Sequence, residues 1–90
     1  MILVTTTVEN VDRFLDVFGT KGVDKRAPLG SKGSTVFRDP TDENRVWAVL
    51  DWDDVGWAKF VSDPQLPPIL KTAGILGKLE FARLVGSYRA

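Results

Sequence analysis

The sequence of 90 residues contains no cysteine, no histidine and only one methionine. Without thiolate or imidazole side chains, the chain cannot form the usual zinc or non-haem iron site, and a histidine-ligated haem is excluded as well. Catalytic sets built on Ser-His-Asp or Cys-His are likewise impossible, and no disulfide can form. We therefore expect a cytoplasmic protein that holds no metal ion and no cofactor.

An excess of charge is also missing, because 12 basic side chains balance 12 acidic ones. Dedicated nucleic-acid binders usually carry a basic excess, so nucleic acid is not an expected partner. No apolar run approaches the roughly 20 residues that a membrane-spanning helix needs, and the apolar start from Met1 to Val4 is too short for a signal peptide. Aromatic side chains are plentiful by contrast, with five Phe, three Trp and one Tyr, which either fill a core or line a pocket or an interface.

The first third of the chain predicts a strand, a helix and a loop. Residues 1–8 are nearly all apolar or β-branched, which is typical of a strand. Asn10 can cap a following helix. The apolar stripe of that helix has helical spacing and consists of Val11, Phe14, Leu15 and Phe18. Gly19 or Gly22 is its expected end, and the Gly- and Lys-rich residues 21–34 predict a mobile loop.

The rest of the chain predicts three strands and two helices. In chain order they are a strand over 35–38, a polar turn over 39–44, a strand over 45–52, a helix from Asp53 and Asp54 to the break at Asp63-Pro64, a short helix from Pro67-Pro68 to Gly74, and a strand over 79–88. One face of the third strand is expected to carry Val46, Ala48, Leu50 and Trp52. The buried side of the following helix is expected to consist of Trp57, Phe60 and Val61.

The order strand, helix, strand, strand, helix, strand is typical of the ferredoxin-like fold of the α+β class. We therefore predict that residues 1–90 form one domain, with a four-stranded antiparallel sheet and its helices on one face. The other face would carry Leu3, Trp47 and Val49. Leaving such side chains in water forgoes several kcal/mol at roughly 25 cal/mol per Å². We therefore predict a homodimer in which two copies pack these sheet faces together.

Four segments resemble the antibiotic biosynthesis monooxygenase-like family: Arg38-Asp39-Pro40, Val46 to Trp52 followed by Asp53, Phe60-Val61-Ser62-Asp63-Pro64, and Lys71-Thr72-Ala73-Gly74-Ile75. The resemblance spans essentially the whole chain and implies a dimeric α+β barrel. Haem-degrading members of this family need a histidine on a helix, which this chain lacks. Similar cofactor-free oxygenases of aromatic polyketides place a Trp at the position of Trp52, and their substrate anion itself reacts with oxygen. The resemblance thus implies that Trp52 is a pocket wall and a hydrogen-bond donor.

Six side chains are candidates for a ligand pocket: Trp52, Trp57, Phe37, Phe60, Arg38 and Arg83. The aromatic ones could line a cavity for an aromatic ligand, or they could simply fill the core between the sheet and the helices. Either arginine could bind an enolate or a carboxylate if it points into a cavity. A strand arginine can equally pair across strands with an acid such as Glu80 or Asp51. The catalytic residues and the general base remain unassigned.

Two other clusters have a structural and a functional interpretation each. Asp51, Asp53 and Asp54 could serve acid–base chemistry or a hard cation, but helix capping also explains Asp53 and Asp54. The segment from Gly30 to Ser34 could bind an anion together with the nearby cations Lys21, Lys25 and Arg26, or act as a lid, or form a solvated loop.

The sequence therefore predicts a small homodimeric barrel that resembles cofactor-independent monooxygenases acting on small aromatic or polyketide-like compounds. The alternative is a non-catalytic dimer that binds a small ligand or serves as an accessory module.

Overall fold

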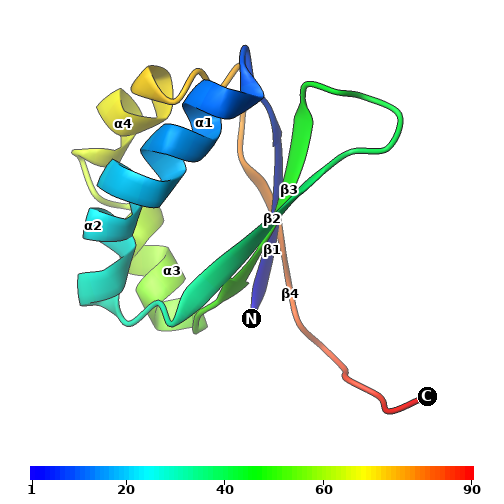
Figure 1. The fold of residues 1–90 in the computed structure, drawn as a ribbon. Helices are drawn as coiled ribbons and strands as arrows, with labels where there is room; N and C mark the ends of the chain where they lie inside the picture. The colour runs from blue at the N-terminus through cyan, green and yellow to red at the C-terminus, as the bar shows by residue number, and fades with distance from the viewer.

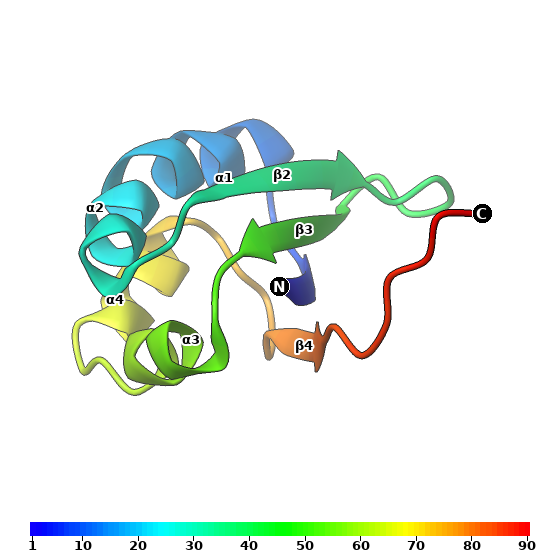
Figure 2. The ribbon, with the colours of Figure 1, turned by 90° about the horizontal axis from the view of Figure 1, so that it is seen from below.

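One antiparallel sheet and one layer of helices make up the structure, a computed structural model of residues 1–90 (Figure 1). The elements in chain order are β1 (Ile2–Thr7), α1 (Val11–Val17), a π-helical turn (Phe18–Gly22), α2 (Val23–Arg26), a 3-10 turn (Ala27–Leu29), β2 (Gly33–Arg38), β3 (Arg45–Asp51), α3 (Asp54–Val61), α4 (Leu66–Thr72) and β4 (Glu80–Arg83). The strand order is β2-β3-β1-β4, with β2 and β4 at the edges (Figure 2). All neighbouring strands are antiparallel and the helices cover one face, so the predicted ferredoxin-like fold is confirmed.

The register of the strands decides which side chains face the helices. Ala48 in β3 lies opposite Val4 in β1 and opposite Val36 in β2. Because side chains alternate along a strand, the predicted face of β3 with Val46, Ala48 and Leu50 is buried against the helices. The core on this face has two parts. The larger part contains Ile2, Val4, Ala48, Leu50, Trp52, Trp57, Phe60 and Leu66, and the smaller part contains Val8, Phe14, Val17, Val46 and Ala73.

The first helix begins as predicted, because the Asn10 side chain accepts a hydrogen bond from the Arg13 backbone N–H at 2.9 Å. The predicted loop over residues 21–34 is wrong, since helical structure continues to Leu29 and β2 begins at Gly33. A glycine inside a helix costs only about 1 kcal/mol relative to alanine. Packing offsets this cost, because every fourth residue of the run lines the same buried space: Phe14, Phe18, Gly22 and Arg26. The run ends at Gly30, whose φ of 91° suits glycine.

Two predictions about the second half need correction. The last strand was expected over residues 79–88, but β4 pairs only with β1, and Arg83 already lies opposite Ile2 at the start of the chain. The chain after Leu84 leaves the sheet and extends away from it (Figure 1). On α3, Trp57 and Phe60 are buried as expected, whereas Val61 is 44% exposed. The helix start is confirmed, because the Asp53 carboxylate accepts from the Gly56 N–H at 2.7 Å.

Apolar side chains also cover part of the sheet face that the helices leave open. Leu3 lies opposite Val49, and Phe37 lies opposite Trp47, so these four residues lie on the same face. We call this face, which the helices do not cover, the outer face of the sheet. Phe37 is 53% exposed there. The Trp47 indole N–H donates to the Asp39 carboxylate at 2.9 Å, which holds the ring in place. None of the helices is both long and apolar enough to cross a membrane.

Candidate functional site

A cavity of about 70 Å³ lies between the sheet and the helices. Of the 18 residues that line it, 15 are hydrophobic, and they come from β1, β3 and all four α-helical segments or the turns beside them. The three lining residues that are not hydrophobic are Gly22, Thr6 and Arg26. The cavity therefore offers an apolar environment with one cationic group.

Arg26, the last residue of α2, is the unusual member of this lining because it is only 6% exposed. Its Nη2 donates to the Phe18 carbonyl oxygen at 2.9 Å, and its guanidinium carbon lies 3.8 Å from the centre of the Phe18 ring. No carboxylate pairs with it, since the three ion pairs of the structure involve other residues. Burial lowers the pKa of Arg26 from its usual value of 12.5.

Gly22 gives this guanidinium its space. A Cβ atom at Gly22 would lie 2.6 Å from Arg26 Nη1, so any side chain there would displace the guanidinium from its present position. The π-helical turn at Phe18–Gly22 therefore supplies both the aromatic surface and the gap against which Arg26 packs. Such turns are frequent at functional sites.

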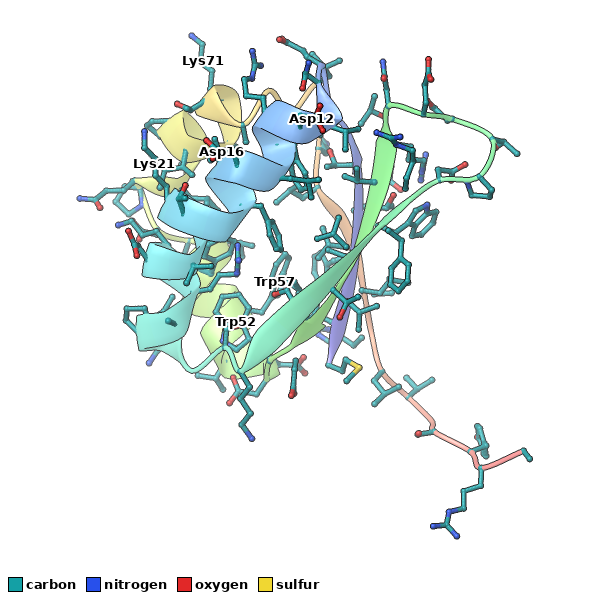
Figure 3. The ribbon with its side chains drawn as sticks, viewed as in Figure 1. Asp12, Asp16, Lys21, Trp52, Trp57 and Lys71 are labelled. Atoms are coloured by element: carbon teal, nitrogen blue, oxygen red, sulfur yellow. The ribbon has the colours of Figure 1, made fainter.

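The two core tryptophans, Trp52 and Trp57, both lie between the sheet and the helices (Figure 3), but they differ in hydrogen bonding. Trp52 donates its indole N–H to the Leu29 carbonyl oxygen at 2.9 Å, and it does not line the cavity. Trp57 lines the cavity, is 3% exposed, and has a buried indole N–H with no hydrogen-bond partner. Its ring packs edge-on against Trp52, with 6.2 Å between the ring centres. The core indole N–H without a hydrogen-bond partner therefore belongs to Trp57, where the family resemblance implied that Trp52 is the donor.

The structure brings three of the six candidate residues together. Trp52, Trp57 and Phe60 form one aromatic cluster, with ring centres 5.3 to 6.2 Å apart, and Trp57 and Phe60 line the cavity. Phe37 is elsewhere, because alternation along β2 turns it to the outer face while Val36 faces the helices. The prediction that Phe37 lines the same space is wrong.

The two candidate arginines also lie away from the cavity. Arg38 is exposed at the end of β2, opposite Val46, and lines a shallow surface pocket beside Glu9 and Asn10. Arg83 is exposed on β4, where it pairs with the Asp54 carboxylate at 3.3 Å. Both arginines lie on edge strands, and neither pairs with Glu80 or Asp51, the acids suggested by the sequence.

A second, open pocket of about 380 Å³ adjoins Arg26. Phe18 and Arg26 line both this pocket and the buried cavity, so they form the wall between the two spaces. Ser31, Lys32 and Ser34 line the open pocket from the other side. Of the residues that the sequence grouped as a possible anion site, Arg26 and Ser31 to Ser34 line this pocket. Lys21, Lys25 and Gly30 do not line it, and Lys25 pairs with Asp63 instead. The signal for Arg26 was its spacing, four and eight residues after Gly22 and Phe18 on one helical face.

Asp39 and Asp53 accept hydrogen bonds that support the fold, and no acidic side chain lines the cavity. Asp39 lies beside the outer face, where the Trp47 indole N–H and then the Thr41 backbone N–H lower its pKa to about 2. Asp53 caps α3, and no group of three or more His, Cys, Asp or Glu side chains is placed to hold a metal ion. The cavity lining contains no acidic side chain.

No protein-family model and no curated protein sequence matches this chain. Solved structures do match it. A mutant form of SnoaB, a cofactor-independent oxygenase from Streptomyces nogalater, is 18% identical with a TM-score of 0.70, covering 96% of this chain and 92% of that one. A structure described as an antibiotic biosynthesis monooxygenase is 11% identical with a TM-score of 0.66, covering 97% of both chains. A dimeric ferredoxin-like protein from an uncultured marine organism is 12% identical with a TM-score of 0.59, covering 99% of this chain and 90% of that one. At these identities the likeness establishes a shared fold, which is the fold that the family resemblance implied.

Proposed function

We propose that this protein is a homodimer that binds a small, mostly apolar aromatic compound between its sheet and its helices and oxidises it with molecular oxygen, without a cofactor. The observation that supports this proposal is an apolar cavity whose lining residues include the buried cation Arg26 and Trp57, whose buried indole N–H has no partner. The fold is shared with SnoaB, which is a cofactor-independent oxygenase.

In such a reaction the substrate supplies the electrons. A carbon activated by aromatic rings loses a proton, and the resulting anion forms a bond to one atom of oxygen. Uptake of a proton gives a hydroperoxide, and loss of water from it leaves a carbonyl group, so that one oxygen atom enters the product and the other leaves as water. The apolar lining of the cavity would exclude bulk water from these reaction steps. The Trp57 N–H would donate to the oxygen on which negative charge develops.

The size of the cavity sets a condition on the substrate. Its volume of about 70 Å³ is below the roughly 150 Å³ that accommodates a benzene ring in an engineered apolar cavity. A ring compound therefore needs Phe18 and Arg26 to shift so that the cavity joins the open pocket of about 380 Å³. The joined space falls within the range of ordinary ligand pockets.

The homodimer would form through the outer face of the sheet. Leu3, Phe37, Trp47 and Val49 share that face, and a structure with the same fold is described as dimeric. Two sheets packed face to face would remove these side chains from water and close the barrel. Phe37 would then contribute to the interface.

Oxygen uptake tests the activity most simply. The wild-type protein should consume oxygen with at least one member of a panel of anthrones and quinols in the presence of a chelator and no added cofactor. Trp57→Phe should lower turnover roughly tenfold or more, because it removes one donor to the developing charge. Trp57 is 3% exposed, so the smaller ring should lower the free energy of unfolding by on the order of 1–3 kcal/mol. No hydrogen bond is lost with the indole N–H, and turnover is compared per folded molecule.

Trp52→Phe is the matched control. It should lower the free energy of unfolding by about 1–3 kcal/mol more than Trp57→Phe does, because it removes a similar part of a buried ring and also leaves the Leu29 carbonyl without its donor. Turnover per folded molecule should be kept. Silence of the wild type across the whole panel, or equal turnover losses in both variants, would contradict the proposed activity.

A second function is favoured by the absence of an acidic side chain from the cavity lining and by the small cavity. A non-catalytic dimer that binds a small ligand needs neither a base nor oxygen. It predicts saturable binding of an aromatic probe with no oxygen uptake.

A further inference from the structure

The buried charge of Arg26 has no protein group to neutralise it. Only one of the five N–H groups of a guanidinium has a protein acceptor here, the Phe18 carbonyl oxygen. Buried arginines are normally paired with an acid, because an unpaired charge in an apolar site is costly. The chain keeps this arginine at 6% exposure beside a cavity with 15 hydrophobic lining residues.

The open pocket next to Arg26 is positively charged and contains free polar groups. Its lining includes Arg26 and Lys32, and no acidic residue. The Lys32 ammonium is in none of the ion pairs of the structure. Ser31 and Ser34 add hydroxyl groups to the same wall, while Phe18 and Val36 add apolar surface. A ligand with a negatively charged oxygen and an apolar body would complement both parts.

We propose that Arg26, together with Lys32, binds the anionic oxygen of a small aromatic carboxylate or phenolate, whose ring lies against Phe18 and extends toward the buried cavity. This inference rests on the proposed binding of an aromatic ligand and specifies its chemical class. Gly22 is part of the site, because the space beside it lets the guanidinium carbon lie 3.8 Å from the centre of the Phe18 ring. A guanidinium can hold a carboxylate through two parallel hydrogen bonds.

The test compares charged and neutral probes of one shape. Benzoate and its neutral counterpart benzamide are each titrated into the wild-type protein by calorimetry. The phenolate arm uses 4-nitrophenolate and its neutral counterpart 4-nitroanisole in the same way. We expect benzoate, 4-nitrophenolate or both to bind about tenfold or more tightly than the neutral counterpart, as charge-assisted hydrogen bonds allow. Preference in one arm only identifies which oxygen anion the site selects.

The variants assign the preference to its residues. Arg26→Met should abolish the preference for the charged probe over the neutral probe. Lys21→Gln, which removes a cation from the exposed side of the same helical run, should keep it. Lys32→Gln should reduce it by a smaller factor, and this exposed position provides a test even if Arg26→Met does not fold.

The outcomes separate the two proposals. If charged and neutral probes bind equally to the wild type, or if the preference survives Arg26→Met, the anion site is refuted while aromatic binding stands. If no probe of either kind binds, the proposed ligand binding fails, and the anion site fails with it.

Discussion

Replacing Gly56 with alanine tests how closely α3 packs against the 3-10 turn at Ala27–Leu29. In an isolated helix the change would stabilise by up to about 1 kcal/mol. In this structure a Cβ at Gly56 would meet Trp52 Nε1 and would lie 2.5 Å from the Leu29 carbonyl oxygen. These two atoms form the 2.9 Å hydrogen bond that anchors Trp52 in the core.

The cost therefore has two parts. Separating the buried donor and acceptor costs about 1–3 kcal/mol, and displacing Trp52 from its packed position costs a similar amount, about 1–3 kcal/mol. After the gain in helix propensity, we expect the free energy of unfolding to fall by about 2–4 kcal/mol. For a domain of this size that corresponds to a decrease in Tm on the order of 10–20 °C.

Urea denaturation followed by tryptophan fluorescence measures this change, with Gly19→Ala as the matched control. A Cβ at Gly19 meets no atom within 4 Å, and Gly19 does not have a positive φ. The control should therefore raise the free energy of unfolding by roughly 0.5–1 kcal/mol. If Gly56→Ala is as stable as the wild type, the close approach of α3 to Trp52 and Leu29 is refuted.

Two further predictions concern the outer face. The pKa of Asp39 is lowered to about 2 from 3.8, mainly by the Trp47 N–H, so the native state favours its ionised form. This contribution to stability is complete above about pH 4 and is lost as the pH falls toward 2. Asp39→Asn should therefore flatten the dependence of the urea midpoint on pH between about pH 4 and 2. An unchanged slope would contradict the lowered pKa of Asp39. Phe37→Glu should convert the proposed dimer into a folded monomer in sedimentation at micromolar concentration, because it places a charge in the interface, whereas Val55→Glu on exposed α3 should not; a wild-type monomer would rule out the dimer.

The strands and their order could be predicted from the sequence because the evidence is local. Alternating apolar residues in β3, the polar turn before it, and the caps at Asn10 and Asp53 each occupy a few neighbouring positions. The end of the first helix could not be predicted in this way. Gly19, Gly22 and the Gly- and Lys-rich residues 21–34 suggested that the helix ends and a loop follows. The packing of Phe18 and Arg26 against the rest of the core outweighs the low helix propensity of glycine.

The candidate site depended on contacts that span long distances in the sequence. Whether Phe37 or Val36 faces the helices is decided by the pairing of β2 with β3, which the residues of β2 alone do not specify. Likewise, the roles of Trp52 and Trp57 depend on the Leu29 carbonyl, 23 residues before Trp52. The aromatic cluster was predictable from composition and spacing, but the free donor and the buried cation became visible only in three dimensions.

The indole N–H resonances in a nitrogen–proton NMR spectrum test the central claim most directly, because each of the three tryptophans reports a different place. Trp47 reports the outer face, Trp52 reports the closed core, and Trp57 reports the cavity wall. On titration with benzoate or hydroquinone, we predict a saturable shift of the Trp57 resonance and little change at Trp47. A Trp57 resonance that stays in place while ligand saturates the protein would contradict binding between the sheet and the helices.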